Sequence, residues 1–112
     1  MKLGNYNFVF GLGFLKEINK DNSLVVDGLK MRAGLETILP NLMNRDVETL
    51  FDVLKMANKT ETPRANDAEL EALIAQTNIE DLFNEVFEAM KESNFTKEKT
   101  TALMKAIQGK KK

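Results

Sequence analysis

Aromatic residues alternate with other residues near the start of the chain, and a glycine-containing pair stands just before them. Tyr6, Phe8 and Phe10 fall on the same side of an extended segment, because side chains of a strand point alternately to its two faces. Gly4-Asn5 suits a two-residue turn, since glycine adopts positive φ without a steric penalty. The pattern predicts a β-hairpin over residues 2–10. An isolated hairpin is marginal in water, so its aromatic side must rest on helices.

A helical spacing of apolar residues follows the predicted hairpin. Gly11 and Gly13 let the chain turn away from the strand. The next apolar residues share one face of a short helix: Phe14, Leu15 and Ile18. A polar loop then separates this helix from the rest of the chain.

The segment after this loop begins with a short β-prone stretch, residues 24–26, which Asp27-Gly28 ends. From Leu29 onward the apolar period becomes helical. The predicted stripe consists of Met31, Leu35, Ile38, Leu39 and Leu42. Pro40 lies inside this stripe, and proline removes one backbone hydrogen bond of a helix. Either the helix kinks at Pro40, which we favour, or it ends near Leu39 and a new turn begins.

Three further helices are predicted, each from an apolar stripe behind a capping residue. Asp46 is a good N-cap for the first. Asn66 with Glu69 has the spacing of a capping box and begins the second, and Asn78 begins the third. The stripes are Val47, Leu50, Phe51, Leu54 and Ala57, then Leu70, Leu73 and Ile74, and then Ile79, Leu82, Phe83, Val86, Phe87 and Met90.

The end of the chain differs in charge from the part before it. Residues 66–92 hold eight acidic residues and one lysine, whereas residues 97–112 hold six lysines and one glutamate. A last helix is expected to start at Thr96, to carry Leu103, Met104 and Ile107 on one face, and to stop at Gly109. For the lysines at 110–112 three interpretations stay open: a solvated end, a weak and salt-dependent nucleic-acid contact, or adenine-rich codons on which ribosomes shift frame.

These elements together predict the fold class and the domain organisation. The chain of 112 residues has the length of one domain. The fold class is mainly α: a compact bundle of five or six short helices around one core, with a small N-terminal β-hairpin. We divide the chain into a helical domain over residues 1–95 and a basic C-terminal helix and tail over residues 96–112.

The composition excludes most catalytic and ligand-binding chemistry. The chain contains no histidine and no cysteine, so it lacks the residues of Ser-His and Cys-His catalytic pairs and of zinc sites built on nitrogen or sulfur. Gly11-x-Gly13 has no third glycine and no parallel βαβ context, as a dinucleotide fingerprint requires. We therefore expect no catalytic residue, no cofactor and no metal. The apolar run over residues 8–15 is too short to span a bilayer, and a net charge of −1 does not attract nucleic acid.

Several loose motifs follow one another in a characteristic order. They are Phe10-Gly11-Leu12-Gly13-Phe14-Leu15-Lys16-Glu17, then Gly34-Leu35-Glu36 and Leu39-Pro40, and later Leu82-Phe83-x-Glu85-Val86. In this order the chain resembles the small tail assembly chaperone family of long-tailed, siphovirus-type bacteriophages, over about residues 2–95. After Phe95 no motif of the family is recognised.

The resemblance implies a function that needs no catalysis. Members of this family bind the tape measure protein, help to recruit tail tube subunits around it, and are absent from the finished virion. The implied location is the host cytoplasm, and the implied partners are the tape measure protein and the tail tube protein, with neither nucleic acid nor a membrane among them. The alternative is a small helical DNA-binding regulator, which the charge balance disfavours.

The contact that the resemblance implies is a helix bound in an apolar groove. Internal methionines favour such adaptable surfaces, and self-association of the chain is a further expectation. The apolar residues that we expect to contact the partner are Phe14, Leu15, Leu39, Leu42, Phe87, Met90, Leu103 and Ile107.

Overall fold

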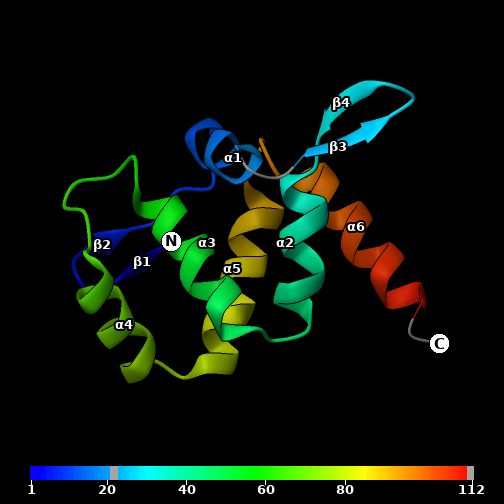
Figure 1. Cartoon of the computed structure of the whole chain (residues 1–112). Coiled ribbons are helices and arrows are strands. Elements are labelled where there is room, and N and C mark those ends of the chain that lie inside the picture. Colours follow the sequence, from blue (N-terminus) through cyan, green and yellow to red (C-terminus); the bar gives the residue numbers. More distant parts are fainter. Residues whose placement is uncertain (21–22, 111–112) are drawn as a thin grey trace.

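The computed structural model describes residues 1–20 and 23–110. Over these residues it contains six helices and two short antiparallel hairpins (Figure 1). The elements are β1 (Lys2–Leu3), β2 (Tyr6–Asn7), α1 (Leu12–Asn19), β3 (Ser23–Val26), β4 (Leu29–Arg32), α2 (Gly34–Met43), α3 (Val47–Asn58), α4 (Asp67–Gln76), α5 (Ile79–Glu92) and α6 (Lys97–Lys110). The predicted helical bundle with an N-terminal hairpin is confirmed.

The N-terminal hairpin has the predicted turn. β1 pairs with β2 across Gly4-Asn5, with Leu3 opposite Tyr6, and Gly4 has a φ of 56°. Phe8 and Phe10 are buried in the core immediately after the hairpin. The aromatic side of this segment therefore rests on the helices, as the sequence predicts.

One buried amide holds the hairpin segment against the rest of the bundle. The side chain of Asn58, at the end of α3, donates from Nδ2 to the carbonyl oxygens of Asn7 at 2.9 Å and of Pro63 at 3.3 Å. Its Oδ1 accepts a hydrogen bond from the backbone N–H of Ala65 at 2.8 Å. Because a buried polar group is costly when it is unpaired, these bonds fix three separate segments at one point.

The segment after α1 differs from the prediction. Asp27 and Gly28 both have positive φ, 51° and 80°, and they form the two-residue turn of a second hairpin, β3–β4. Met31 therefore lies in a strand, and the prediction that the helix begins at Leu29 is wrong. The Asp-Gly pair is a strong hairpin signal, and the spacing of Met31 from later apolar residues imitates a helical period.

The helix α2 begins at a glycine that α1 packs against closely. The backbone N–H of Gly34 donates to Oδ1 of Asn19 at 2.9 Å, so a side chain of α1 caps the first turn of α2. A Cβ atom at Gly34 would lie 2.8 Å from the carbonyl oxygen of Ile18, which leaves no room for a larger residue. Pro40 lies inside α2, so the alternative in which the helix ends near Leu39 is wrong.

The predicted N-caps of the later helices are all present. Asp46, Asn66 and Asn78 each accept a backbone hydrogen bond from the first turn of their helix, and Asn66 forms the full capping box with Glu69. Gly109 does not end the last helix, because α6 continues to Lys110. Glycine inside a helix costs about 1 kcal/mol relative to alanine, so Gly109 weakens the end of α6 without stopping it.

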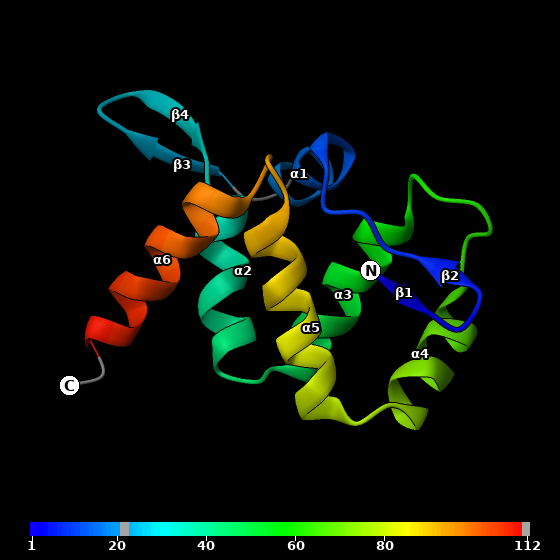
Figure 2. The same ribbon diagram turned by 180° about the vertical axis from the view of Figure 1, so that it is seen from behind.

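The core lies between the hairpin segment and the helices. Figure 2 shows α5 between the N-terminal hairpin on one side and α2 and α6 on the other. The buried residues that form the core are Phe8, Phe10, Phe14, Ile18, Leu35, Ile38, Leu39, Leu42, Leu50, Val53, Leu54, Ala57, Ala65, Leu70, Leu82, Phe83, Val86, Phe87 and Met90. The stripe predicted on α5 is therefore its core face, apart from the exposed Ile79.

Candidate functional site

Most of the expected partner-binding residues belong to the core in this conformation. Five of them are buried: Phe14, Leu39, Leu42, Phe87 and Met90. The other three, Leu15 on α1 and Leu103 and Ile107 on α6, are partly buried and pack against the core. The structure thus brings Leu103 and Ile107 together on α6 and leaves Leu15 on another helix. Their role in binding stays a prediction.

The last helix covers one face of the bundle. α6 packs against α2 and α5, and its partly buried residues Leu103, Met104 and Ile107 contact the core. We call the face of α2 and α5 on which α6 lies the α6 seat. It is defined by Glu36 on α2, which pairs with Lys99, and by Met43 on α2 and Phe87 on α5, which line a groove together with Met104 of α6. Since α6 lies at the edge of the bundle (Figure 1), the seat would become accessible if this helix moved away.

The polar contacts at the α6 seat are incomplete. Nζ of Lys99 lies 2.8 Å from Oε2 of Glu36, and this pair links α6 to α2. The second carboxylate oxygen, Oε1 of Glu36, and Oγ1 of Thr100 are buried and have no hydrogen-bond partner among the described residues. A buried polar group without a partner costs about 1–3 kcal/mol. The seat therefore holds α6 less firmly than its apolar contacts alone would suggest.

A groove of about 340 Å³ opens beside the second half of α6. It is lined from α6 by Met104 and Gln108 and from the bundle by Met43, Arg45, Asn84, Phe87, Glu88 and Lys91. The Arg45 guanidinium lies over the rings of Phe83 and Phe87, with its Cζ 5.2 and 5.5 Å from the two ring centroids. Methionine and aromatic surface in a charged rim is suited to an adaptable helix contact.

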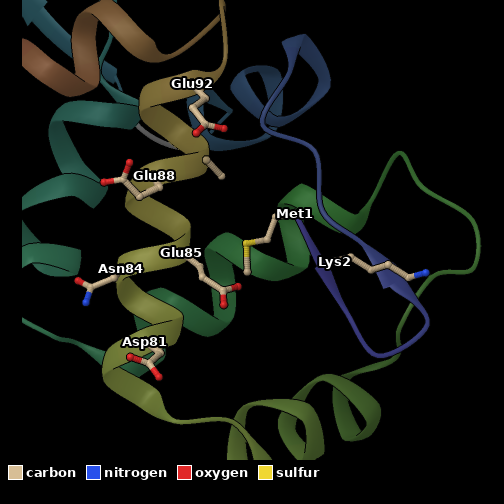
Figure 3. Close-up of a pocket in the computed structure, with 8 residues that line it drawn as sticks. Met1, Lys2, Asp81, Asn84, Glu85, Glu88 and Glu92 are labelled. Atoms are coloured by element: carbon tan, nitrogen blue, oxygen red, sulfur yellow. The ribbon is translucent and has the colours of Figure 1, made fainter.

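A second, more open groove lies on the other side of α5. It has a volume of about 520 Å³ and is lined by Met1, Lys2, Asp81, Asn84, Glu85, Glu88, Ala89 and Glu92. In Figure 3, Glu85 and Glu92 extend from α5 toward the side of Met1, whereas Asn84 and Glu88 point toward the opposite side. Asn84 and Glu88 thus form a ridge between the two grooves, because they line both.

The open groove continues toward the end of α5 as a second hollow. This hollow, of about 380 Å³, shares Met1, Ala89 and Glu92 with the open groove. It adds Val9 and Phe95, whose exposed fractions are 44% and 56%. We call the two hollows together the outer groove. The sequence does not reveal it, because Val9 and Phe95 lie outside the helical stripes.

Shifted pKa values occur at two contacts between elements of the fold. Hydrogen bonds from Lys20 and Lys59 lower the pKa of Glu17, which joins α1 to the end of α3. The hydrogen bond that the Tyr6 hydroxyl donates to Glu69 raises the pKa of Tyr6 and links the hairpin to α4. Both contacts join elements that are far apart in the sequence and so help to hold the fold together.

Residues 1–20 and 23–110 contain neither a metal-binding cluster nor a membrane-spanning helix. No group of three or more acidic residues within this part of the chain has the arrangement of a metal site. No helix there is long and apolar enough to cross a membrane.

The sequence agrees with one known family over nearly its whole length. A family model described as phage tail assembly chaperone protein, TAC, matches residues 2–105. The match extends past the recognised motifs into α6, so this helix belongs to the family pattern too. No curated protein and no solved structure matches the chain.

Proposed function

The chain belongs to the phage tail assembly chaperone family, and we propose that it binds the tape measure protein of its phage and helps to recruit tail tube subunits around it. It acts in the host cytoplasm and leaves before the virion is complete. The role is one of binding alone, in which no covalent bond is made or broken. Residues with catalytic chemistry are accordingly not needed in either groove.

The observation that carries this proposal is the α6 seat. It is a face that already binds a helix, through the side chains of Leu103, Met104 and Ile107. Two buried polar atoms there have no hydrogen-bond partner among the described residues. A helix of the tape measure protein that replaces α6 would find the same apolar surface. The two unpaired atoms lower the free energy that replacement of α6 requires, which favours a reversible contact.

The outer groove is a separate surface to which the second partner can bind. It lies across the ridge of Asn84 and Glu88 from the α6 seat, so a helix on the seat leaves it open. We assign the tail tube subunit to this groove. The acidic residues there repel phosphate groups, and this charge disfavours the alternative role as a DNA-binding regulator.

Co-expression with the tape measure protein tests the proposal. The native chain should raise the soluble fraction of that protein, because it covers apolar helices that otherwise aggregate. Met43→Asp places a charge in the α6 seat and should abolish the gain. Val47→Asp is the matched control, because Val47 is an exposed residue at the start of α3, outside the seat. A gain that Met43→Asp leaves intact would exclude the seat as the binding surface.

A further inference from the structure

Only one of the two carboxylate oxygens of Glu36 has a partner on α6. Oε2 pairs with Lys99, whereas Oε1 is buried and has no hydrogen-bond partner among the described residues. Glu36 lies in the first turn of α2, and α6 is the helix that pairs with it. Because Lys99 of α6 reaches this carboxylate, a side chain of whichever helix lies on the α6 seat can donate to it.

Lysine and arginine differ in how they satisfy a carboxylate. The ammonium group of lysine is a compact donor, and here it is engaged with Oε2 at 2.8 Å. A guanidinium group presents two parallel N–H donors and can bind both oxygens of one carboxylate. An arginine in the position of Lys99 would thus supply the hydrogen bond that Oε1 lacks.

Thr100, the next residue of α6, also has a buried polar atom that lacks a partner among the described residues. Thr100 is completely buried, with an exposed fraction of 0%, and its hydroxyl has no partner among the described residues. Replacing an unpaired buried hydroxyl by an apolar group of the same shape is neutral or stabilising. Valine has this shape and would fill the same position without an unpaired polar atom.

We propose that the α6 seat selects a helix of a partner protein that presents an arginine toward Glu36, followed by a small aliphatic residue, and that α6 is the weaker, built-in occupant of the same seat. This inference rests on the proposed function for the identity of the partner as a tail protein. The preference itself follows from Glu36 and Thr100. α6 then protects the apolar seat until a better-matched helix replaces it.

Amide exchange of α6 in the full chain tests the preference without any partner. Lys99→Arg should slow exchange of the α6 amides about tenfold, corresponding to about 1.4 kcal/mol, because α6 opens less often. Lys105→Arg is the matched control, since Lys105 is exposed on the same helix, and it should change nothing. In a Glu36→Gln background, Lys99→Arg should have no effect. Equal exchange rates in the native and Lys99→Arg chains, or slowing that persists with Glu36→Gln, would overturn the proposal.

Competition by synthetic peptides tests the same preference for a separate helix. The probes are the peptide of residues 95–108 with the native sequence and the same peptide carrying Lys99→Arg and Thr100→Val. Added to the isotopically labelled full chain, the substituted peptide should displace α6 and accelerate its amide exchange at about tenfold lower concentration. Equal potency of the two peptides would contradict the proposal. Neither experiment uses the tape measure protein. Each can therefore support or contradict the preference for arginine even if the co-expression test of the proposed function fails.

Discussion

Asn58 determines how three segments meet, and its sequence context gives no sign of this. It follows the apolar stripe of α3 and looks like a residue at the polar end of a helix. In the structure it is buried and bonded to Asn7, Pro63 and Ala65. Sequence periodicity identifies residues that face a core, but a buried amide depends on long-range partners that no local pattern encodes.

Phe83 illustrates the opposite case, in which periodicity is sufficient. Its ring is 1% exposed, as the stripe on α5 predicts. Phe83→Ala should lower the free energy of unfolding by about 3–5 kcal/mol, because it removes buried surface and leaves a cavity. Denaturant unfolding measures the change. Phe95→Ala is the control at an exposed ring and should cost little; comparable losses at the two positions would contradict the assignment of the core.

The ion pairs of Glu17 make the free energy of unfolding depend on pH. Hydrogen bonds from Lys20 and Lys59 lower its pKa below the ordinary 4.5, so the stabilisation is present above that value and is lost as the pH falls through the folded-state pKa. Glu17→Gln should lower stability at pH 7 by about 0.5–1 kcal/mol, as expected for an exposed ion pair. The difference from the native chain should shrink in urea titrations below pH 4.5. A difference of the same size at both pH values would mean that the charge contributes nothing.

The N-terminal hairpin is stabilised by its contacts with the helices of the bundle. The Phe8 N–H donates to the Met1 carbonyl at 2.8 Å, and the Val9 N–H donates to the Ala57 carbonyl of α3 at 2.9 Å. Amides of Phe8 and Val9 should therefore exchange slowly in NMR measurements, whereas that of Asn5 in the turn should exchange fast. If all three exchange at the rate of Asn5, the hairpin does not rest on α3 in solution.

The N-termini of the helices are the most predictable feature of the elements, and a strand pair is the least. Asp46, Asn66 and Asn78 cap their helices as the sequence indicates, because N-capping is a local interaction. Periodicity does not identify the hairpin β3–β4, because Met31 also fits the helical stripe that continues into α2. Short apolar segments fit a strand and a helix about equally well, so the Asp27-Gly28 turn is the feature that distinguishes them here.

At the scale of the whole molecule, the sequence predicts the candidate binding surfaces only in part. Apolar stripes identify residues that are buried, and five of the eight expected contact residues are buried against the bundle itself. Whether a stripe packs inside the chain or against a partner depends on the arrangement of helices, which periodicity does not contain. The α6 seat and the outer groove both arise from that arrangement.

The opposite charges of residues 66–92 and 97–112 suggest that the last helix folds back along the acidic helices α4 and α5. α6 does pack against α5, but also against α2. Among the described residues, the ion pair that joins α6 to the bundle is instead Lys99 with Glu36 on α2. The helix is held against α2 and α5 mainly by apolar contacts, so salt should have little effect on its docking.

Binding of an isolated tape measure segment to chains with and without residues 96–112 tests the central claim most directly. Circular dichroism first establishes that the shortened chain is folded, and dye binding should rise because the α6 seat is uncovered. The account predicts that the shortened chain binds the segment more tightly, by about tenfold or more, because the partner no longer competes with α6. A folded, monomeric shortened chain that fails to bind the segment would contradict it, since α6 would then be part of the contact and not its cover.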